Sequence, residues 1–371
     1  MKKILFSGAL ALVFVSCSRD EVVEINRDGD EIRFGVVTDA ATRAADVYCN
    51  NNLPGAFNVW ATYNDATYID GDLIQKEDNA WVNKTGVRYW PKTGNVTFYA
   101  QVNAGTAFQW NNGAPTIKDY TVPTVVAEQK YLLYAVKSQG RSDNPVTLNF
   151  RHALSQIVFQ AKNTNANLYV EIDGVTICNL GNVNTFTYPT ANTDDNIINH
   201  DGVGETTTTG AWGTWVNLTG GNTDYPVTFD AVYVPGDKTV KSLTNTNDTD
   251  KEFSSNAMLL LPQTTTAWDT TTKPSAQTGS YFLVDCKICN VAGDAYASTD
   301  IVLWDGPVAI PASFTWEQGK KYIYTFVFGN GNGGYDPTPD TPDPVLVPIT
   351  FDVTVDDFVP VTQPDTPMET E

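Results

Sequence analysis

The residues of this sequence that could carry enzymatic chemistry are its histidines and its many carboxylates. A Ser-His-Asp or Cys-His site would have to use His152 or His200, because the chain has only 2 histidines. His152 lies between two apolar, strand-like runs, where a structural role is the stronger expectation, and His200 lies among Asn and Asp residues. Nothing among the 43 acidic residues singles out a general acid and base. We therefore expect no catalytic residues and no enzymatic activity.

Cys17 has the surroundings of a lipid-attachment site. Lys2 and Lys3 precede an apolar run from Ile4 to Val15, which is typical of a targeting segment and too short to span a bilayer comfortably. Phe14-Val15-Ser16-Cys17 then looks like the lipobox of a bacterial lipoprotein, with Phe14 where Leu is usual. The sequence predicts a lipoprotein signal peptide over residues 1–17 and lipidation of Cys17. Ordinary secretion with an incidental Cys17 is the alternative.

The other cysteines are Cys49, Cys178, Cys286 and Cys289, which could pair in three ways in an exported protein. Cys286 and Cys289 lie in an expected strand, and their odd separation puts the two thiols on opposite faces. We therefore do not expect these two to bond each other. No second C-x-x-C pair completes a zinc site, so we expect no metal and no cofactor. Buried, inert thiols and one long-range disulfide both remain open.

Arg43-Ala44 is a candidate site of proteolytic cleavage. The surrounding residues 38–45 are small and polar, which is the composition of an accessible, protease-sensitive loop. On the residues alone, a solvated surface charge is the simpler interpretation of Arg43.

Two distant stretches of the chain have the same apolar spacing. Ile32, Phe34 and Val36 alternate with polar residues or Gly over residues 30–38, which predicts a strand with one apolar face. Ile349, Phe351, Val353 and Val355 repeat that spacing near the other end of the chain. We interpret the first strand as a temporary occupant of an apolar slot, and the last strand of another copy as its replacement. The alternative is that the last strand folds back as an edge strand of its own domain.

Short β-type runs broken by Gly, Asn, Asp and Pro fill the rest of the 371-residue chain. No stretch has a sustained helical period, so the sequence predicts an all-β sandwich fold, and the length fits roughly two domains. We expect the boundary within residues 150–170, and a stiff, Pro-rich linker over residues 337–344 that holds the last strand away from the second domain. The net charge of −20 and the lack of a Lys/Arg cluster exclude nucleic acid as a partner.

Further motifs lie between the two strands. They are Tyr89-Trp90-Pro91 leading to Phe98-Tyr99-Ala100, Leu148-x-Phe150-x-His152-Ala153-Leu154-Ser155-Gln156-Ile157, and Trp316-Glu317-Gln318-Gly319-Lys320-Lys321-Tyr322-x-Tyr324. Together with the lipobox, Ile32-x-Phe34, Arg43-Ala44 and the last strand, their order and spacing resemble the fimbrillin family of Bacteroidales, the type V pilins. Phe14 and the Pro-rich run depart from the family pattern.

The resemblance implies two transthyretin-like Greek-key β-sandwich domains in tandem. The expected parts are a signal peptide (1–17), a tether with a removable first strand (18–43), two sandwiches (44–160 and 161–336) and a linker with the donor strand (337–371). It also implies export as a palmitoylated outer-membrane lipoprotein, cleavage after Arg43, and donor-strand exchange with other fimbrial subunits in a head-to-tail polymer. Fimbriae of this kind support adhesion to a host or bacterial surface ligand.

A second interpretation is a surface lipoprotein that does not polymerise. It would bind a glycan or host ligand through exposed aromatic residues such as Trp212 and Trp215.

Overall fold

The computed structural model describes residues 30–36, 55–78, 80–105, 107–111, 114–193, 211–244, 257–291, 296–297, 299–329, 334–345 and 349–357. Cys17, Arg43, Ala44, Cys49 and His200 lie outside these residues. Lipidation of Cys17 and cleavage after Arg43 therefore stay predictions.

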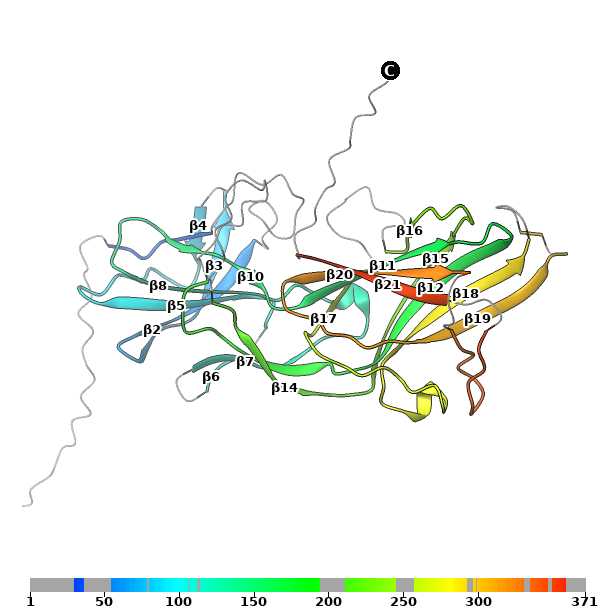
Figure 1. Ribbon diagram of the computed structural model, residues 1–371. Helices are drawn as coiled ribbons and strands as arrows, with labels where there is room; N and C mark the ends of the chain where they lie inside the picture. The colour runs from blue at the N-terminus through cyan, green and yellow to red at the C-terminus, as the bar shows by residue number, and fades with distance from the viewer. Residues whose placement is uncertain are drawn as a thin grey trace, which may run out of the picture.

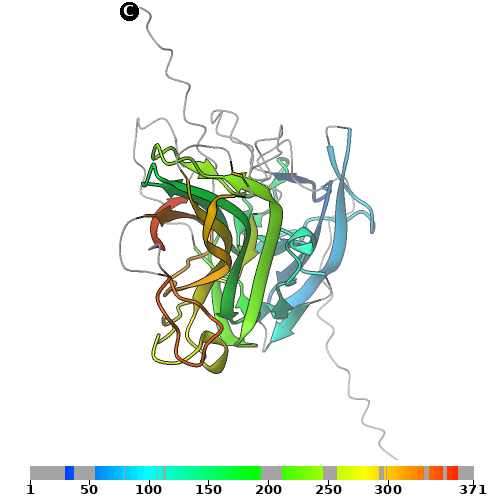
Figure 2. The same cartoon turned by 90° about the vertical axis from the view of Figure 1, so that its right-hand side faces the viewer.

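The described chain is all-β, as the sequence predicted. Apart from the two short 3₁₀ turns η1 (Val126–Glu128) and η2 (Pro274–Ala276), every regular element is a strand. Figure 1 shows the strands spread along one long axis, with the blue and cyan strands toward one end and the gold to red strands toward the other. The view of Figure 2 shows the blue strands on one side and the green, gold and red strands on the other. None of the described segments forms a helix with the length and apolar character that crossing a membrane requires.

The first sheet has eight strands in the order β10-β8-β5-β2-β3-β4-β1-β9. Their bounds are β1 (Phe34–Val36), β2 (Ala56–Tyr63), β3 (Ala66–Glu77), β4 (Ala80–Asn83), β5 (Asn95–Val102), β8 (Leu133–Gly140), β9 (Val146–Leu148) and β10 (Arg151–His152). The strand predicted over residues 30–38 is therefore β1, preceded by an isolated bridge between Glu31 and Tyr89.

The second sheet has the order β14-β13-β7-β6 and joins parts of the chain that are far apart in sequence. Its strands are β6 (Phe108–Asn111), β7 (Ala114–Thr121), β13 (Val183–Thr187) and β14 (Thr214–Thr219). The ring of Phe186 in β13 lies 4.5 Å from that of Tyr134 in the first sheet. Pairing between β13 and β7 crosses the expected boundary at residue 160, because the buried Phe186 is opposite Ile117 and packs on Tyr134, which both precede this boundary. The division into two Greek-key domains stays a prediction.

Two further sheets face each other across a second part of the core. One has the order β16-β11-β20-β21, with β17 also paired to β11, and the other has the order β15-β12-β18-β19. Their strands are β11 (Ser155–Asn163), β12 (Leu168–Leu180), β15 (Thr223–Tyr233), β16 (Lys241–Ser242), β17 (Met258–Leu260), β18 (Tyr281–Asn290), β19 (Ile301–Pro311), β20 (Lys320–Phe328) and β21 (Ile349–Asp357). Phe282 of β18 contacts Phe326 of β20 edge to face at 5.2 Å, which joins the two layers.

The Pro-rich run is not the stiff arm that the sequence predicted. Tyr335 and Ala309 of β19 exchange two main-chain hydrogen bonds of 2.9 and 2.8 Å, and Asp336 N–H donates to Asp343 O at 2.9 Å. The Lys273 ammonium lies 2.6 Å from the Asp340 carboxylate and forms an ion pair with this run. The run is thus a hairpin-like loop on β19, seen in red below that strand in Figure 1, because long-range main-chain pairing outweighs the extended preference of its prolines.

Candidate functional site

The candidate site begins with the position of β1 inside the first sheet. β1 pairs with β4 in antiparallel fashion and with β9 in parallel fashion. Phe34 is therefore opposite Trp81 on one side and Val146 on the other. The strand is not at an edge, so its removal would open a groove with main-chain donors and acceptors along both walls.

The apolar side chains of β1 complete the core beneath this groove. Ile32 and Phe34 are each 5% exposed, and Val36 is half-buried. The ring of Phe34 lies edge to face against Phe57 at 6.4 Å and Phe98 at 5.7 Å between centroids. Burial of one such aliphatic or aromatic side chain contributes about 1.5–3 kcal/mol, so an empty groove would expose a costly apolar surface.

The segment before β1 hydrogen-bonds to Arg88 and Trp90, at the start of the Tyr89-Trp90-Pro91 motif. Ile32 N–H donates to Arg88 O at 2.7 Å, and Trp90 N–H donates to Asp30 O at 3.0 Å. These are main-chain bonds, so they position any strand that lies in the groove, whatever its side chains.

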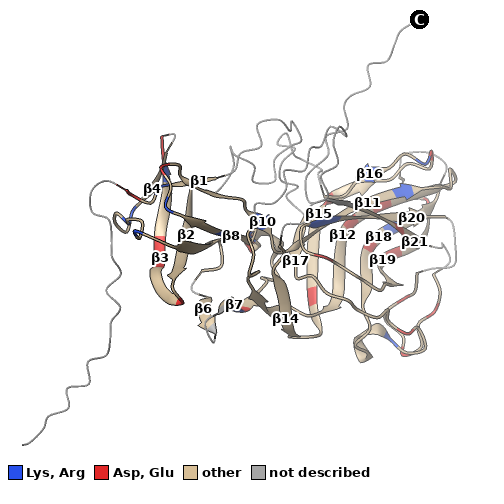
Figure 3. Cartoon of the chain, turned by 60° about the vertical axis from the view of Figure 1, so that its left-hand side comes forward, with Lys and Arg blue, Asp and Glu red and all other residues tan. Residues whose placement is uncertain are grey.

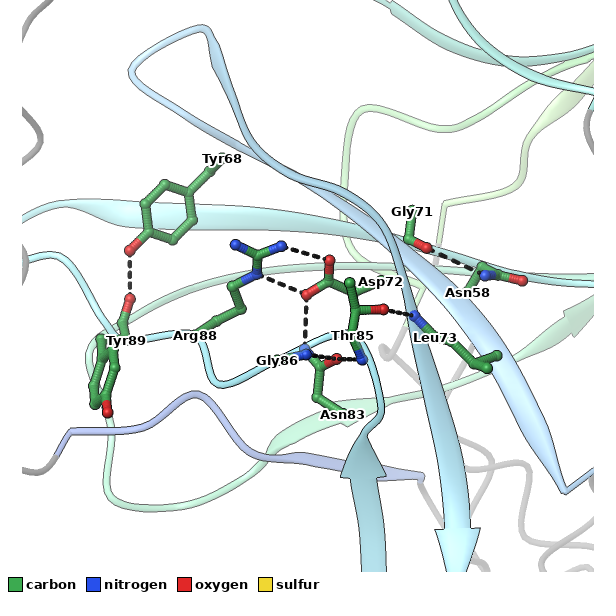
Figure 4. Close-up of polar contacts among 10 residues, drawn as sticks. All are labelled: Asn58, Tyr68, Gly71, Asp72, Leu73, Asn83, Thr85, Gly86, Arg88 and Tyr89. Carbon is green, nitrogen blue, oxygen red and sulfur yellow. Dashed lines mark hydrogen bonds and ion pairs between the residues drawn. The ribbon is translucent and has the colours of Figure 1, made fainter.

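An ion pair with the buried carboxylate of Asp72 holds the partly exposed Arg88 in place behind that wall (Figure 4). Two nitrogens of the Arg88 guanidinium donate to the two oxygens of Asp72 at 2.7 and 2.8 Å, and Asn83 Nδ2 donates to Asp72 Oδ2 at 2.7 Å. Burial of Asp72 acts to raise its pKa, but the hydrogen bonds from Arg88 and Asn83 outweigh it and hold the pKa below its ordinary value. The ion pair thus fixes the wall that receives β1.

The last strand, β21, lies at the edge of its own sheet, which corrects the expectation that it is held away from the second domain. It pairs along its whole length with β20, from Phe328↔Ile349 to Lys320↔Asp357. The alternative interpretation, an edge strand of its own domain, describes this structure. β21 pairs with β20 rather than extending into solvent, because an unpaired strand would leave a row of main-chain polar groups without protein partners.

Of the four apolar side chains on one face of β21, two pack into the core and two do not. Ile349 is fully buried, and Phe351 packs against Phe282 at 5.3 Å and Tyr324 at 5.8 Å between ring centroids. Val353 and Val355 are 48% and 52% exposed. The strand therefore has two apolar side chains that its own domain leaves largely in solvent.

The structure places the predicted first and last strands in two different sheets, each with its Phe in an aromatic pocket. Cys178, Cys286 and Cys289 are buried free thiols, so Cys286 and Cys289 do not bond each other, as expected. No group of three or more His, Cys, Asp or Glu side chains within the described ranges is arranged to hold a metal ion. Figure 3 shows acidic and basic positions interspersed over the strands.

The aromatic surface of the second interpretation is only partly available. Trp212 is 45% exposed, but the Arg151 guanidinium lies 4.4 Å from its ring centroid. Trp215 is half-buried, donates from Nε1 to Ala153 O at 2.7 Å and packs on Phe186. His152 is also half-buried, with its ring 5.4 Å from that of Tyr131. Of the two predicted tryptophans, Trp212 is the one that presents a large aromatic surface to solvent.

Sequence reasoning missed the polar residues around the groove. Asp72, Arg88 and Arg141 all contact the first strand or the wall beside it, yet each looks like an ordinary polar residue of a strand or loop. The only available signal was the position of Arg88 directly before Tyr89-Trp90-Pro91.

The chain is similar to several known proteins. The model of a family described as fimbrillin-like matches residues 42–357. A candidate cell adhesion protein from Bacteroides uniformis shares 16% identity over 89% of this chain and 100% of its own, with a TM-score of 0.44. One from Parabacteroides distasonis shares 13% identity over 88% and 98% of the two chains, with a TM-score of 0.45. The fimbrial anchor protein Mfa2 from Porphyromonas gingivalis shares 10% identity over 89% and 98%, with a TM-score of 0.30.

Comparison with curated proteins finds no significant match. The family model, in contrast, covers most of the sequence, including the groove walls and the last strand. The chain therefore belongs to the fimbrillin-like family.

Proposed function

We propose that this chain is a structural subunit of cell-surface fimbriae that assembles by donor-strand exchange and supports adhesion. Membership of the fimbrillin-like family supports a fimbrial, non-enzymatic role. In the proposed route the chain is exported as a lipoprotein through Cys17 and reaches the outer membrane. A protease then cleaves between Arg43 and Ala44, the first strand leaves, and β21 of another copy takes its place.

The position of β1 between two strands carries this proposal. When β1 leaves, β4 stays paired with β3 and β9 stays tethered to β8 by the short loop over residues 141–145, so both walls of the groove remain in the chain. A strand inserted there regains main-chain bonds on both sides and fills the pockets of Ile32 and Phe34.

β21 has the side chains that this groove requires. With Ile349, Phe351 and Val353 in the places of Ile32, Phe34 and Val36, each pocket receives the residue type that it holds in the intact chain. Val353 and Val355 are exposed on their own domain, so their transfer into a groove would bury new apolar surface. Because donor and groove are different surfaces, the contact is head-to-tail and does not close, which generates a fibre.

Val353→Asp tests the proposal without disturbing the separate subunit. Val353 is 48% exposed, so the subunit should keep its fold and its thermal stability. In a groove the new carboxylate would take the half-buried place of Val36, and we expect loss of polymer in electron micrographs after protease treatment. Thr354→Asp adds the same charge on the opposite face of β21 and should polymerise. If Val353→Asp forms as much polymer as the unaltered chain, donor-strand exchange in this register is wrong.

The cleavage step needs its own experiment because Arg43 and Ala44 lie outside the described residues. We expect the surface form to begin at Ala44 by N-terminal sequencing, and Arg43→Ala to remain unpolymerised. Fibres assembled by Arg43→Ala would remove the proteolytic step.

The second interpretation, a ligand-binding lipoprotein that does not polymerise, depends on Trp212, which is 45% exposed. Deletion of residues 345–371 distinguishes the two. Loss of polymer with an intact fold supports the pilin, whereas loss of ligand binding alone supports the lipoprotein.

A further inference from the structure

The contacts that hold the first strand in its groove are of two kinds. The first kind is made by the main chain: Ile32 N–H to Arg88 O at 2.7 Å, Trp90 N–H to Asp30 O at 3.0 Å, and Val146 N–H to Arg33 O at 2.6 Å. Any strand in the same register can make these bonds. They favour occupancy of the groove without distinguishing its occupants.

The second kind depends on charged side chains of the first strand. The Arg141 guanidinium forms an ion pair with the Asp30 carboxylate, and Arg33 Nη2 donates to Asp143 O. Asp30 is the more enclosed partner, with a side chain 15% exposed against 46% for Arg141. Both contacts come from the loop over residues 141–145, which joins β8 to β9 and brings the Pro145 side chain close to Gly35.

The last strand lacks the side chains for this second kind of contact. In the register that matches Ile349 to Ile32, Val347 takes the place of Asp30 and Thr350 takes the place of Arg33. Pro348 takes the place of Glu31, and the three main-chain bonds above use no N–H from Glu31, so a proline is tolerated there.

We propose that Arg141 and the carbonyl of Asp143 form a clasp that recognises the first strand and not the last strand. The inference rests on the proposed exchange and adds a regulatory step to it. The clasp keeps the first strand in place after the chain behind it is cut, so the groove stays covered until a donor strand arrives. Arg141 is a specificity-determining residue because it favours one occupant of the groove over the other.

Hydrogen exchange of the full-length chain tests the clasp directly. Arg141→Gln removes the ion pair, and we expect the Ile32 and Val146 amides to exchange about two- to fivefold faster, the range expected for one partly exposed pair. The Ala309 amide, which donates to Tyr335 O in another sheet, should not change. Lys273→Gln is the matched control because it removes an exposed ion pair to Asp340 far from β1. Equal exchange of the Ile32 and Val146 amides in Arg141→Gln and the unaltered chain overturns the clasp.

A second experiment adds a partner for Arg141 to the donor strand. It distinguishes recognition by Arg141 from a general loosening of the loop over residues 141–145. Labelled peptides with the sequence of residues 345–358 are added in excess to the full-length chain after cleavage with trypsin. A peptide carrying Val347→Asp should bind the unaltered chain about two- to fivefold more tightly than the natural peptide. This advantage should vanish in Arg141→Gln, and its persistence there overturns the role of Arg141.

The two experiments fail in different ways. If neither peptide enters the groove, donor-strand exchange is wrong, while the exchange rates of the Ile32 and Val146 amides still decide whether Arg141 holds the first strand. If the natural peptide binds but the Val347→Asp peptide has no advantage, exchange stands and the clasp is overturned.

Discussion

The ring of Phe34 lies edge to face against the ring of Phe98, with 5.7 Å between their centroids. Phe98 belongs to β5, and Phe34 is separated from it in the sheet order by β2, β3 and β4. The first strand therefore reaches across the curved sheet into the core. It is an integral part of the fold even though the proposed function requires it to leave.

Phe34→Ala should destabilise the intact chain markedly. Phe34 is 5% exposed and contacts two other aromatic rings, so its truncation leaves a cavity that costs about 3–5 kcal/mol. Unfolding in denaturant, followed by tryptophan fluorescence, measures the loss. Thr147→Ala, an exposed change opposite Gly35 on β9, should stay within about 0.5 kcal/mol of the unaltered chain. A loss below about 1 kcal/mol in Phe34→Ala would show that β1 contributes little to this core.

The Asp72–Arg88 ion pair should give the fold a defined pH dependence. Because the pKa of Asp72 is lowered in the folded chain, its contribution is present above the unfolded pKa and is lost as pH falls through the folded value. We expect Asp72→Asn to lower the free energy of unfolding by about 1–3 kcal/mol at neutral pH. The difference from the unaltered chain should shrink below a pH of about 4, near the ordinary pKa of Asp.

Asp119→Asn is the control for this pH series. Its carboxylate is 69% exposed and lies 3.9 Å from Lys118, so its removal should change stability little at any pH. A difference between Asp72→Asn and the unaltered chain that stays constant down to pH 2 would contradict the assignment.

Local side-chain periodicity was enough to predict the strands but not their partners. The alternation of Ile32, Phe34 and Val36 predicts one buried face because a strand has a period of two, and Ile32 and Phe34 are indeed in the core. The same reasoning worked for Ile349 and Phe351. It could not show that Val353 and Val355 stay in solvent, because burial depends on how far the opposing sheet extends.

Contacts between distant segments explain the remaining differences. The prolines of residues 337–344 favour extended backbone, yet Tyr335 pairs with Ala309 and Lys273 with Asp340, and composition records neither contact. Likewise β13 joins β7 through pairs such as Phe186↔Ile117, although they lie on opposite sides of the expected boundary. The groove wall was missed because Asp72 looks like an ordinary polar residue of a strand. Its role depends on the hydrogen bond from Arg88, which the sequence does not reveal.

The thiols of Cys178 and Cys286 should be inert in the folded chain. Both side chains are buried, and burial raises the pKa of each thiol far above its ordinary value, so almost no thiolate forms at neutral pH. We expect mass spectrometry to find neither residue alkylated after iodoacetamide treatment of the native protein, and both alkylated in denaturant. Rapid labelling of Cys286 in the native protein would contradict its burial.

The two ends of β21 should differ sharply in their contribution to stability. Ile349 is fully buried and Val355 is 52% exposed, although both belong to the strand paired with β20. Ile349→Ala should therefore lower the free energy of unfolding by about 2–5 kcal/mol, whereas Val355→Ala should change it by no more than about 0.5 kcal/mol. Thermal and denaturant unfolding of the separate subunit measure both changes.

In an assembled fibre, Val355 should contribute to stability although it contributes little in the separate subunit. Val355 would extend the buried face of the inserted strand beyond the place of Val36, so Val355→Ala should lower the fibre's resistance to denaturant while leaving the separate subunit unaffected. The comparison isolates the donor role, because a side chain that is exposed in the subunit can stabilise the fibre only through a neighbouring copy. Equal resistance of Val355→Ala and unaltered fibres would place Val355 outside the groove and limit the inserted segment to Ile349, Phe351 and Val353.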